Sequence, residues 1–127
     1  MQINLLGENM EITPAIHDYV VRRVTNLGKL LAEMEKRGGE AKILFEVGKS
    51  TKHHKRGEFF HSDCSIKIDG KNFYASVDRE DLYDAIDSLK EKLFSEITKS
   101  KKRKQTLFYR GARRIKNVLK GLAPWRK

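Results

Sequence analysis

Charge divides this chain into two parts, and the division limits what each part can fold into. Residues 97–127 contain twelve Lys and Arg and no Asp or Glu, leaving fifteen basic and seventeen acidic residues in positions 1–96. The formal net charge of +10 therefore arises in the C-terminal segment. Cations alone repel one another in a compact structure unless a polyanion neutralises them. The pattern predicts a nearly neutral folded body followed by a basic arm, with nucleic acid favoured as partner over a role in solubility alone.

The chain length fits one domain with an arm. We expect an α/β domain over residues 1–102 and the arm over 103–127. The single cysteine, Cys64, excludes an internal disulfide and favours a cytoplasmic protein. No apolar run reaches membrane-spanning length, and the N-terminal residues lack the basic start of a signal peptide.

Hydrophobic periodicity predicts the element order β-α-β-β-β-α. Alternating apolar residues predict strands over residues 2–6, 41–47, 59–68 and 72–77. Apolar residues at helical spacing predict one helix over 14–37, interrupted by Gly28, and another from near Asp78 to Ile97. Local signals agree with these limits: a Thr13-Pro14 helix start, a Gly38-Gly39 stop and an Asp69-Gly70 hairpin turn.

These elements predict an α+β fold, a two-layer sandwich in which two helices cover one face of a four-stranded mixed sheet. The first strand, the helix and the second strand can form a right-handed crossover between parallel strands, and the later strands an antiparallel meander. The predicted core consists of Ile16, Val20, Val24, Leu27, Phe45, Val47, Cys64, Ile66, Phe73, Val77, Ile86, Leu89 and Leu93.

Two sequence blocks, combined with this element order, resemble a known family. The first block is Ile3-Asn4 followed by GENMEITPAI over residues 7–16 and then Tyr19-Val20; the second is EDLYDAID over residues 80–87 followed by Lys92-Leu93. They resemble the short form of the ribosome hibernation-promoting factor family, also called ribosome-associated inhibitors or ribosomal subunit interface proteins. The resemblance covers about residues 1–100.

The resemblance implies a protein that binds the small ribosomal subunit at the tRNA and mRNA channel, stabilises inactive ribosomes and blocks translation. It implies no catalytic step, no cofactor and no small-molecule substrate. Longer relatives carry a separate C-terminal dimerisation domain, for which this chain is too short. We therefore expect a monomer when the protein is free.

The resemblance also implies which residues face rRNA. The basic positions that match the family's surface on the two helices are Arg22, Arg23, Lys29, Lys90, Lys92, Lys99 and Lys101. Ser95 and Thr98 stand where basic residues are common in the family. The arm has no counterpart to align, so its candidates rest on charge alone: Arg110, Arg113, Arg114 and Lys116 for phosphate contact and Tyr109 for base stacking.

Plainer interpretations compete with several of these sites. Arg22 and Arg23 could be a solvated flank of the apolar stripe, and Lys90 and Lys92, with Glu91 between them, could form an ordinary solvent face. Gly111 and Gly121 weaken an isolated helix in the arm, so we expect residues from about 103 onward to be mobile or loosely docked and to order on rRNA.

Catalytic and metal sites find little support in the sequence. His53, His54 and His61 lack the spacing of a zinc site, and Asp84 and Asp87 have no third group converging on them. A non-enzymatic ribosome-binding protein is therefore the favoured class. The alternative is a general RNA-binding module or RNA-processing enzyme, and a membrane-surface protein using the basic arm is less favoured.

Overall fold

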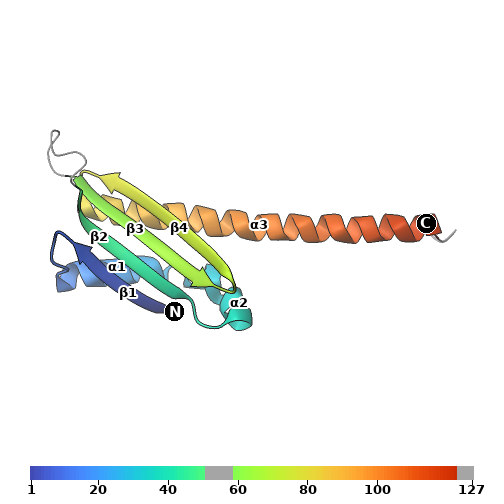
Figure 1. Cartoon of the computed structure of the whole chain (residues 1–127), viewed down its shortest axis with the longest axis horizontal. Coiled ribbons are helices and arrows are strands. Elements are labelled where there is room, and N and C mark those ends of the chain that lie inside the picture. Colours follow the sequence, from blue (N-terminus) through green and yellow to red (C-terminus); the bar gives the residue numbers. More distant parts are fainter. Residues whose placement is uncertain (51–58, 123–127) are drawn as a thin grey trace. The chain divides into compact units, whose positions relative to one another are not determined.

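The computed structural model describes residues 1–50 and 59–122, with side chains described over 1–49 and 59–103. Two compact units are distinguished, Met1–Glu96 and Ile97–Lys127. Along the chain the elements are β1 (Gln2–Glu8), α1 (Pro14–Thr25), α2 (Gly28–Gly38), β2 (Lys42–Ser50), β3 (Phe59–Ile68), β4 (Lys71–Arg79) and α3 (Leu82–Leu122) (Figure 1).

The four strands form one sheet in the order β1-β2-β3-β4. β1 is parallel to β2, and the β2–β3 and β3–β4 pairs are antiparallel. Parallel neighbours need a crossover connection, which α1 and α2 provide, whereas the later strands follow one another as neighbours in the sheet. The predicted α+β class and mixed four-stranded sheet are confirmed.

Alternation along the strands gives the sheet one buried face and one open face. Figure 1 shows α1, α2 and the beginning of α3 behind the sheet, covering the buried face. All thirteen predicted core residues are buried, including Phe45 and Cys64 from the sheet and Leu89 from α3. Ser62 is buried among them and satisfies its hydroxyl by donating to the carbonyl oxygen of Ala85 at 2.8 Å.

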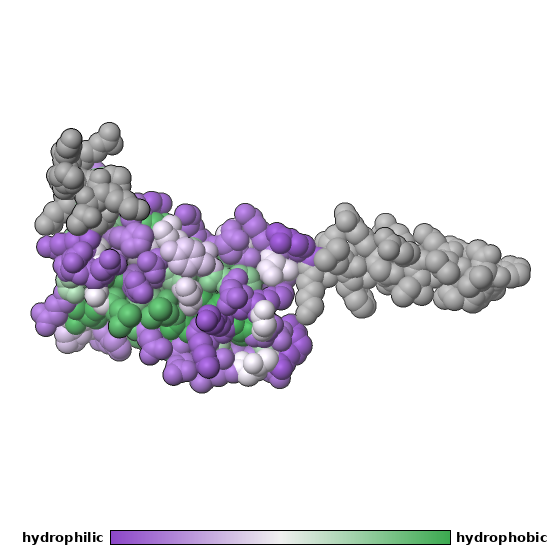
Figure 2. All heavy atoms as spheres, in the orientation of Figure 1, coloured by the Kyte–Doolittle hydropathy of each residue, from purple (hydrophilic) through white to green (hydrophobic). Residues whose placement is uncertain are grey.

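Among the described elements, no helix covers the other face of the sheet. Leu6, Leu44 and Tyr74 lie on it with 52%, 37% and 61% of their surface exposed. Figure 2, in the same orientation as Figure 1, shows hydrophobic residues on this side bordered by hydrophilic ones. The sheet is thus two-sided, as its alternating sequence predicts.

The first predicted helix is divided in two, which corrects the expectation of a single helix over 14–37. α1 ends at Thr25 and α2 begins at Gly28. The Thr25 hydroxyl donates to the Val21 carbonyl oxygen at 2.6 Å, and the Leu27 amide bonds the Val24 carbonyl oxygen at 2.9 Å, one residue short of α-helical pairing. A hydroxyl competing for the helical carbonyl next to a glycine is a recognised cause of such breaks. The fold therefore has three helices in the part of the chain that the structure describes.

The second predicted helix begins later and continues further than expected. β4 extends to Arg79, so α3 starts at Leu82, with the Asp84 amide donating to the Asp81 carboxylate at 2.9 Å. The helix then continues to Leu122, because residues 98–110 contain neither Gly nor Pro and Gly111 and Gly121 do not end it. No helix in the described residues is long and apolar enough to cross a membrane.

The local signals read from the sequence are present at the ends of the elements. The Thr13 hydroxyl accepts from the Ile16 amide at 3.2 Å with Pro14 in the first turn, and α2 ends before Gly39 at φ 84°. Asp69 and Gly70 both have positive φ, 50° and 70°, the conformation of a tight turn matched to the twist of a hairpin.

Candidate nucleic-acid interface

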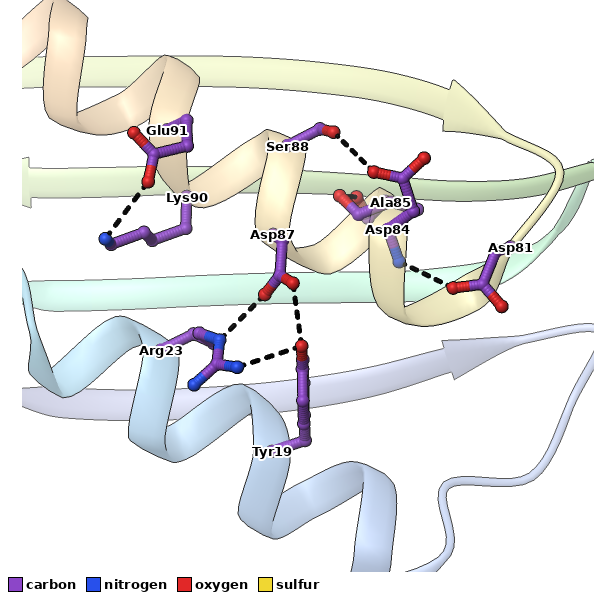
Figure 3. Close-up of polar contacts among 10 residues, drawn as sticks. Tyr19, Arg23, Asp81, Asp84, Ala85, Asp87, Ser88, Lys90 and Glu91 are labelled. Carbon is purple, nitrogen blue, oxygen red and sulfur yellow. Dashed lines mark hydrogen bonds and ion pairs between the residues drawn. The ribbon is translucent and has the colours of Figure 1, made fainter.

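Three polar side chains join α1 to α3 (Figure 3). Tyr19 and Arg23 lie one turn apart on α1, and Asp87 approaches them from α3. Arg23 Nε donates to Asp87 Oδ1 at 2.7 Å, Arg23 Nη2 donates to the Tyr19 hydroxyl at 3.0 Å, and that hydroxyl donates to Asp87 Oδ2 at 2.7 Å. The three groups therefore form a closed ring of hydrogen bonds.

Aromatic contacts hold the same ring of hydrogen bonds from the side. The guanidinium carbon of Arg23 lies 4.3 Å from the centroid of the Tyr19 ring, a cation–π contact. The Tyr83 ring meets Tyr19 edge-on at 4.7 Å between centroids. The hydrogen bond that Arg23 donates to Asp87 raises the pKa of Arg23, and burial, followed by the bond to Asp87, raises the pKa of Tyr19. Both donors therefore keep their protons at neutral pH.

A shallow pocket of about 300 Å³ lies at this junction and is lined by Arg23, Asn26, Asp87, Lys90 and Glu91. Lys90 Nζ is 3.3 Å from Glu91 Oε1 and 5.8 Å from the centroid of the Phe94 ring. The pocket thus combines two cations with two carboxylates. Among the described residues, its cations are already engaged by these acidic neighbours.

The other predicted cations of the two helices differ in their engagement. Arg22 and Lys29 are exposed and form no hydrogen bond or ion pair with the residues that the structure describes. Lys92 is exposed and donates to the carbonyl oxygen of Ser76 at 3.1 Å, on the edge strand β4. Lys99 is exposed and Lys101 half-buried on α3, in the second unit.

The predicted arm residues lie on α3, and the structure describes only their backbone. Arg110, Arg113, Arg114 and Lys116 fall within Leu82–Leu122, and their side chains, like that of Tyr109, lie outside the described part of the chain. His53 and His54 also lie outside the described residues.

His61 lies between two carboxylates on the open face of the sheet. Its Nδ1 is 2.5 Å from Asp78 Oδ1 on β4, and its Nε2 is 3.0 Å from Asp63 Oδ2 on β3. Burial lowers the pKa of His61, but the hydrogen bonds to Asp78 and Asp63 outweigh it, so the pKa is raised above its ordinary value. Over residues 1–50 and 59–122, no cluster of three His, Cys, Asp or Glu residues is arranged to hold a metal ion.

The remaining sequence candidates have structural partners. Asp84 accepts a hydrogen bond from the Ser88 hydroxyl at 3.1 Å and does not converge with Asp87, which faces α1. Cys64 is fully buried, and burial raises the pKa of its thiol to about 12. A thiol with that pKa stays protonated and behaves as a small core residue.

The ring formed by Tyr19, Arg23 and Asp87 was not predicted from the sequence. The i, i+4 spacing of Tyr19 and Arg23 places both on one side of a helix, which was a usable signal. Asp87 carried no comparable signal, because its partners are separated from it by 64 and 68 positions. Only the packing of α1 against α3 brings it to them.

Residues 3–105 match the family described as Sigma 54 modulation protein / S30EA ribosomal protein. The chain belongs to this family. The match covers nearly all of β1, all of β2 to β4 and α3 as far as Gln105, so the Tyr19, Arg23 and Asp87 ring lies inside the family region.

Individual relatives agree with this assignment. The chain is 32% identical over 101 residues to a ribosome hibernation promoting factor of Klebsiella oxytoca, covering 80% of this chain and 94% of that protein. A protein of the same name from Pseudomonas putida is 29% identical over 114 residues, covering 90% of this chain and 100% of the other. The N-terminal domain of Thermus thermophilus Protein Y has the same fold, with a TM-score of 0.63 and 25% identity over 78% of this chain and 98% of that domain.

Proposed function

We propose that this protein is a cytoplasmic ribosome hibernation factor that binds the small ribosomal subunit and silences translation. In this proposal the protein occupies the tRNA and mRNA channel through contacts to rRNA phosphates and keeps ribosomes inactive. It acts stoichiometrically and without a catalytic step. When it is free it is a monomer.

Family membership carries this proposal, and the arrangement of charge supports it. The family match spans residues 3–105. Two relatives that are matched over 94% and 100% of their own length carry the name ribosome hibernation promoting factor. Arg22 and Lys29 offer exposed cations without bonds to other described residues on the helical side of the first unit. When exposed cations of this kind contact phosphates, counterions are released from the nucleic acid, and this release favours binding.

The carboxylates near the interface support binding rather than catalysis. Asp87 is occupied by Arg23 and Tyr19, and Asp84 by Ser88. The acids near them are Glu91 in the pocket and Asp81 at the start of α3, and in the described residues no histidine bonds to Asp84 or Asp87. General acid–base chemistry on RNA needs groups that converge on one reacting atom. A binding surface requires only that cations meet phosphates.

In the second unit we propose that the cations extend the rRNA contact. Arg110, Arg113, Arg114 and Lys116 fall on a helix that continues from the family region. The segment 97–127 has no acidic residue to neutralise them. Phosphate contact with rRNA would supply that neutralisation.

The test is co-sedimentation of an Arg22→Glu/Lys29→Glu variant with small subunits, whole ribosomes and paired ribosomes in sucrose gradients at several salt concentrations. We expect weaker binding and a smaller salt dependence, because two cations no longer neutralise phosphates. These two positions are preferable to Arg23 and Lys92, because reversing either of those would also remove a bond within the protein, to Asp87 or to Ser76.

The matched control is Lys42→Glu/Lys67→Glu. These two exposed lysines are paired across β2 and β3, so the double variant makes the same change of charge on the sheet. It should bind like the wild type. Equal weakening in both variants would indicate a general attraction between the protein and RNA, and unchanged binding by the Arg22 and Lys29 variant would refute the proposed surface.

A further inference from the structure

Asp87 presents a problem for a surface that is proposed to bind RNA. Its carboxylate lines the same pocket as Arg23 and Lys90, and 45% of its side chain is exposed. A negative charge at that place repels phosphate, so simple electrostatics predicts that removing it strengthens binding. The geometry of the ring of hydrogen bonds predicts the opposite.

Both oxygens of the Asp87 carboxylate are used to hold α1 side chains. Oδ1 accepts from Arg23 Nε and Oδ2 accepts from the Tyr19 hydroxyl, which itself accepts from Arg23 Nη2 (Figure 3). The guanidinium is therefore bonded on one edge and stacked on the Tyr19 ring at 4.3 Å. An arginine held in this way has little rotamer freedom left to lose when it binds a ligand.

The bonded arginine still has donors to offer. A guanidinium carries five N–H groups, and the bonds to Asp87 and Tyr19 use two of them. The remaining donors belong to Nη1 and Nη2, the end of the side chain that can meet a phosphate in the two-pronged manner typical of arginine. Arg23 also lines the pocket beside Asn26 and Lys90.

Resting on the proposed function, we propose that Asp87 and Tyr19 are positioning residues for Arg23, which they hold ready to donate to an RNA phosphate at the α1–α3 pocket. Asp87 then strengthens RNA binding although it is itself an anion. Its charge is offset locally by the guanidinium, and its effect is to fix the direction of the donors before RNA arrives.

The experiment compares Asp87→Asn and Tyr19→Phe with the wild type by measuring the dissociation constant for small ribosomal subunits over a range of salt. The amide of Asn keeps the shape but replaces one acceptor oxygen with a donor. We expect each variant to bind about two- to tenfold more weakly, the effect of one long side chain that must be immobilised on binding. The salt slope should not change, because the number of cations is the same.

Asp84→Asn is the matched control. It removes the same charge from the same helix, three residues earlier, but among the described residues the hydrogen bonds of Asp84 go only to Ser88 and to Asp81 at the start of the helix. It should bind as tightly as the wild type or slightly more tightly. If Asp87→Asn behaves like Asp84→Asn, or binds more tightly than the wild type, the positioning role is refuted.

A second comparison separates positioning from a structural role. In an Arg23→Ala background nothing remains to be positioned, so Asp87→Asn should have no further effect on affinity. A purely structural role would weaken binding equally in both backgrounds and would overturn the proposal.

The result for Arg23→Ala alone also keeps this inference distinct from the proposed function. Unchanged affinity in Arg23→Ala would overturn the positioning role, while the Arg22→Glu/Lys29→Glu variant would still decide whether this side of the protein binds ribosomes.

Discussion

In the unit Met1–Glu96 cations lie among acids, whereas the unit Ile97–Lys127 has twelve cations and no acid. Within the first unit Arg23 is bonded to Asp87, Lys90 to Glu91 and Arg37 to Asp69. Of these three cations, Arg23 is held at a known place by two side-chain hydrogen bonds. In the second unit the structure describes a helix as far as Leu122, and the sequence of residues 97–127 offers no acid to pair with the cations. We propose on this basis that the first unit recognises a shape and that the second adds non-specific attraction to a polyanion.

Removing a core side chain should affect the first unit most strongly. Leu89 is fully buried on α3, so Leu89→Ala should lower the free energy of unfolding by about 2–5 kcal/mol. Chemical denaturation would measure this change. Leu44→Ala is the control, because Leu44 lies on the open face with 37% of its surface exposed and should cost much less. Equal effects of the two substitutions would mean that α3 does not supply the core.

Truncation after Lys104 should have the opposite pattern, with little effect on stability and a clear effect on ribosome binding. It removes Arg110, Arg113, Arg114 and Lys116 while leaving the packed unit intact, so we expect a nearly unchanged melting temperature. Ribosome affinity should fall, and the slope of log K against log salt should decrease by roughly 0.7–0.9 for each phosphate that is no longer neutralised. Thermal melting and salt-dependent co-sedimentation measure the two quantities.

A full-length control tests whether charge explains the effect of truncation. The truncation removes seven cations in all, because Lys120, Arg126 and Lys127 are lost as well. Replacing Arg110, Arg113, Arg114 and Lys116 with Gln keeps the length of the chain and should reproduce about four sevenths of the change in slope. A large drop in thermal stability after truncation would instead show that the apolar residues of the segment, such as Ile115 and Leu122, belong to the folded core. An unchanged affinity would remove the second unit from the binding surface.

The two units also differ in how far sequence alone could describe them. In the first, alternation and helical spacing identified every described strand and all thirteen predicted core residues, because burial imposes a regular period on the sequence. Gly28 was noted as an interruption, but the division into α1 and α2 was not predicted, because local competition by Thr25 contributes to it and a periodic pattern does not register that competition. The late start of α3 was missed because Asp78 pairs with His61 in the sheet rather than opening a helix.

The candidate site was predictable only in part. A resemblance can indicate which positions are basic, so Arg22, Arg23 and Lys29 could be selected from the sequence. It cannot say which of them are already bonded, because Asp87 reaches Arg23 across 64 positions of chain. That distinction changes the choice of variants: Arg22 and Lys29 can be reversed with little structural cost, whereas Arg23 belongs to a ring of hydrogen bonds.

The smallest expected effect concerns His61, a histidine of the first unit that lies between two carboxylates. The pKa of His61 is raised above 6.5, because the bonds to Asp78 and Asp63 outweigh the effect of burial. The charged form is therefore favoured by folding, and its stabilisation is fully present below pH 6.5 and lost as the pH rises through the folded-state pKa. His61→Gln should accordingly cost more stability near pH 6 than near pH 9, by about 1 kcal/mol.

Thermal melting of the wild type and of His61→Gln at about pH 6 and about pH 9 measures how the stability cost of the substitution changes with pH. Every other histidine is present in both proteins, so the comparison isolates His61. His17→Gln is the control, because His17 is exposed on α1 and its ring lies 3.4 Å from the carboxylate of Asp18. A cost of His61→Gln that is equal at the two pH values, or larger at the higher one, would mean that the charged ring adds nothing to the single hydrogen bond that a neutral imidazole can donate to Asp63 or Asp78. Hydrogen bonding alone, without charge pairing, would then hold Asp63 and Asp78 beside His61 in the first unit.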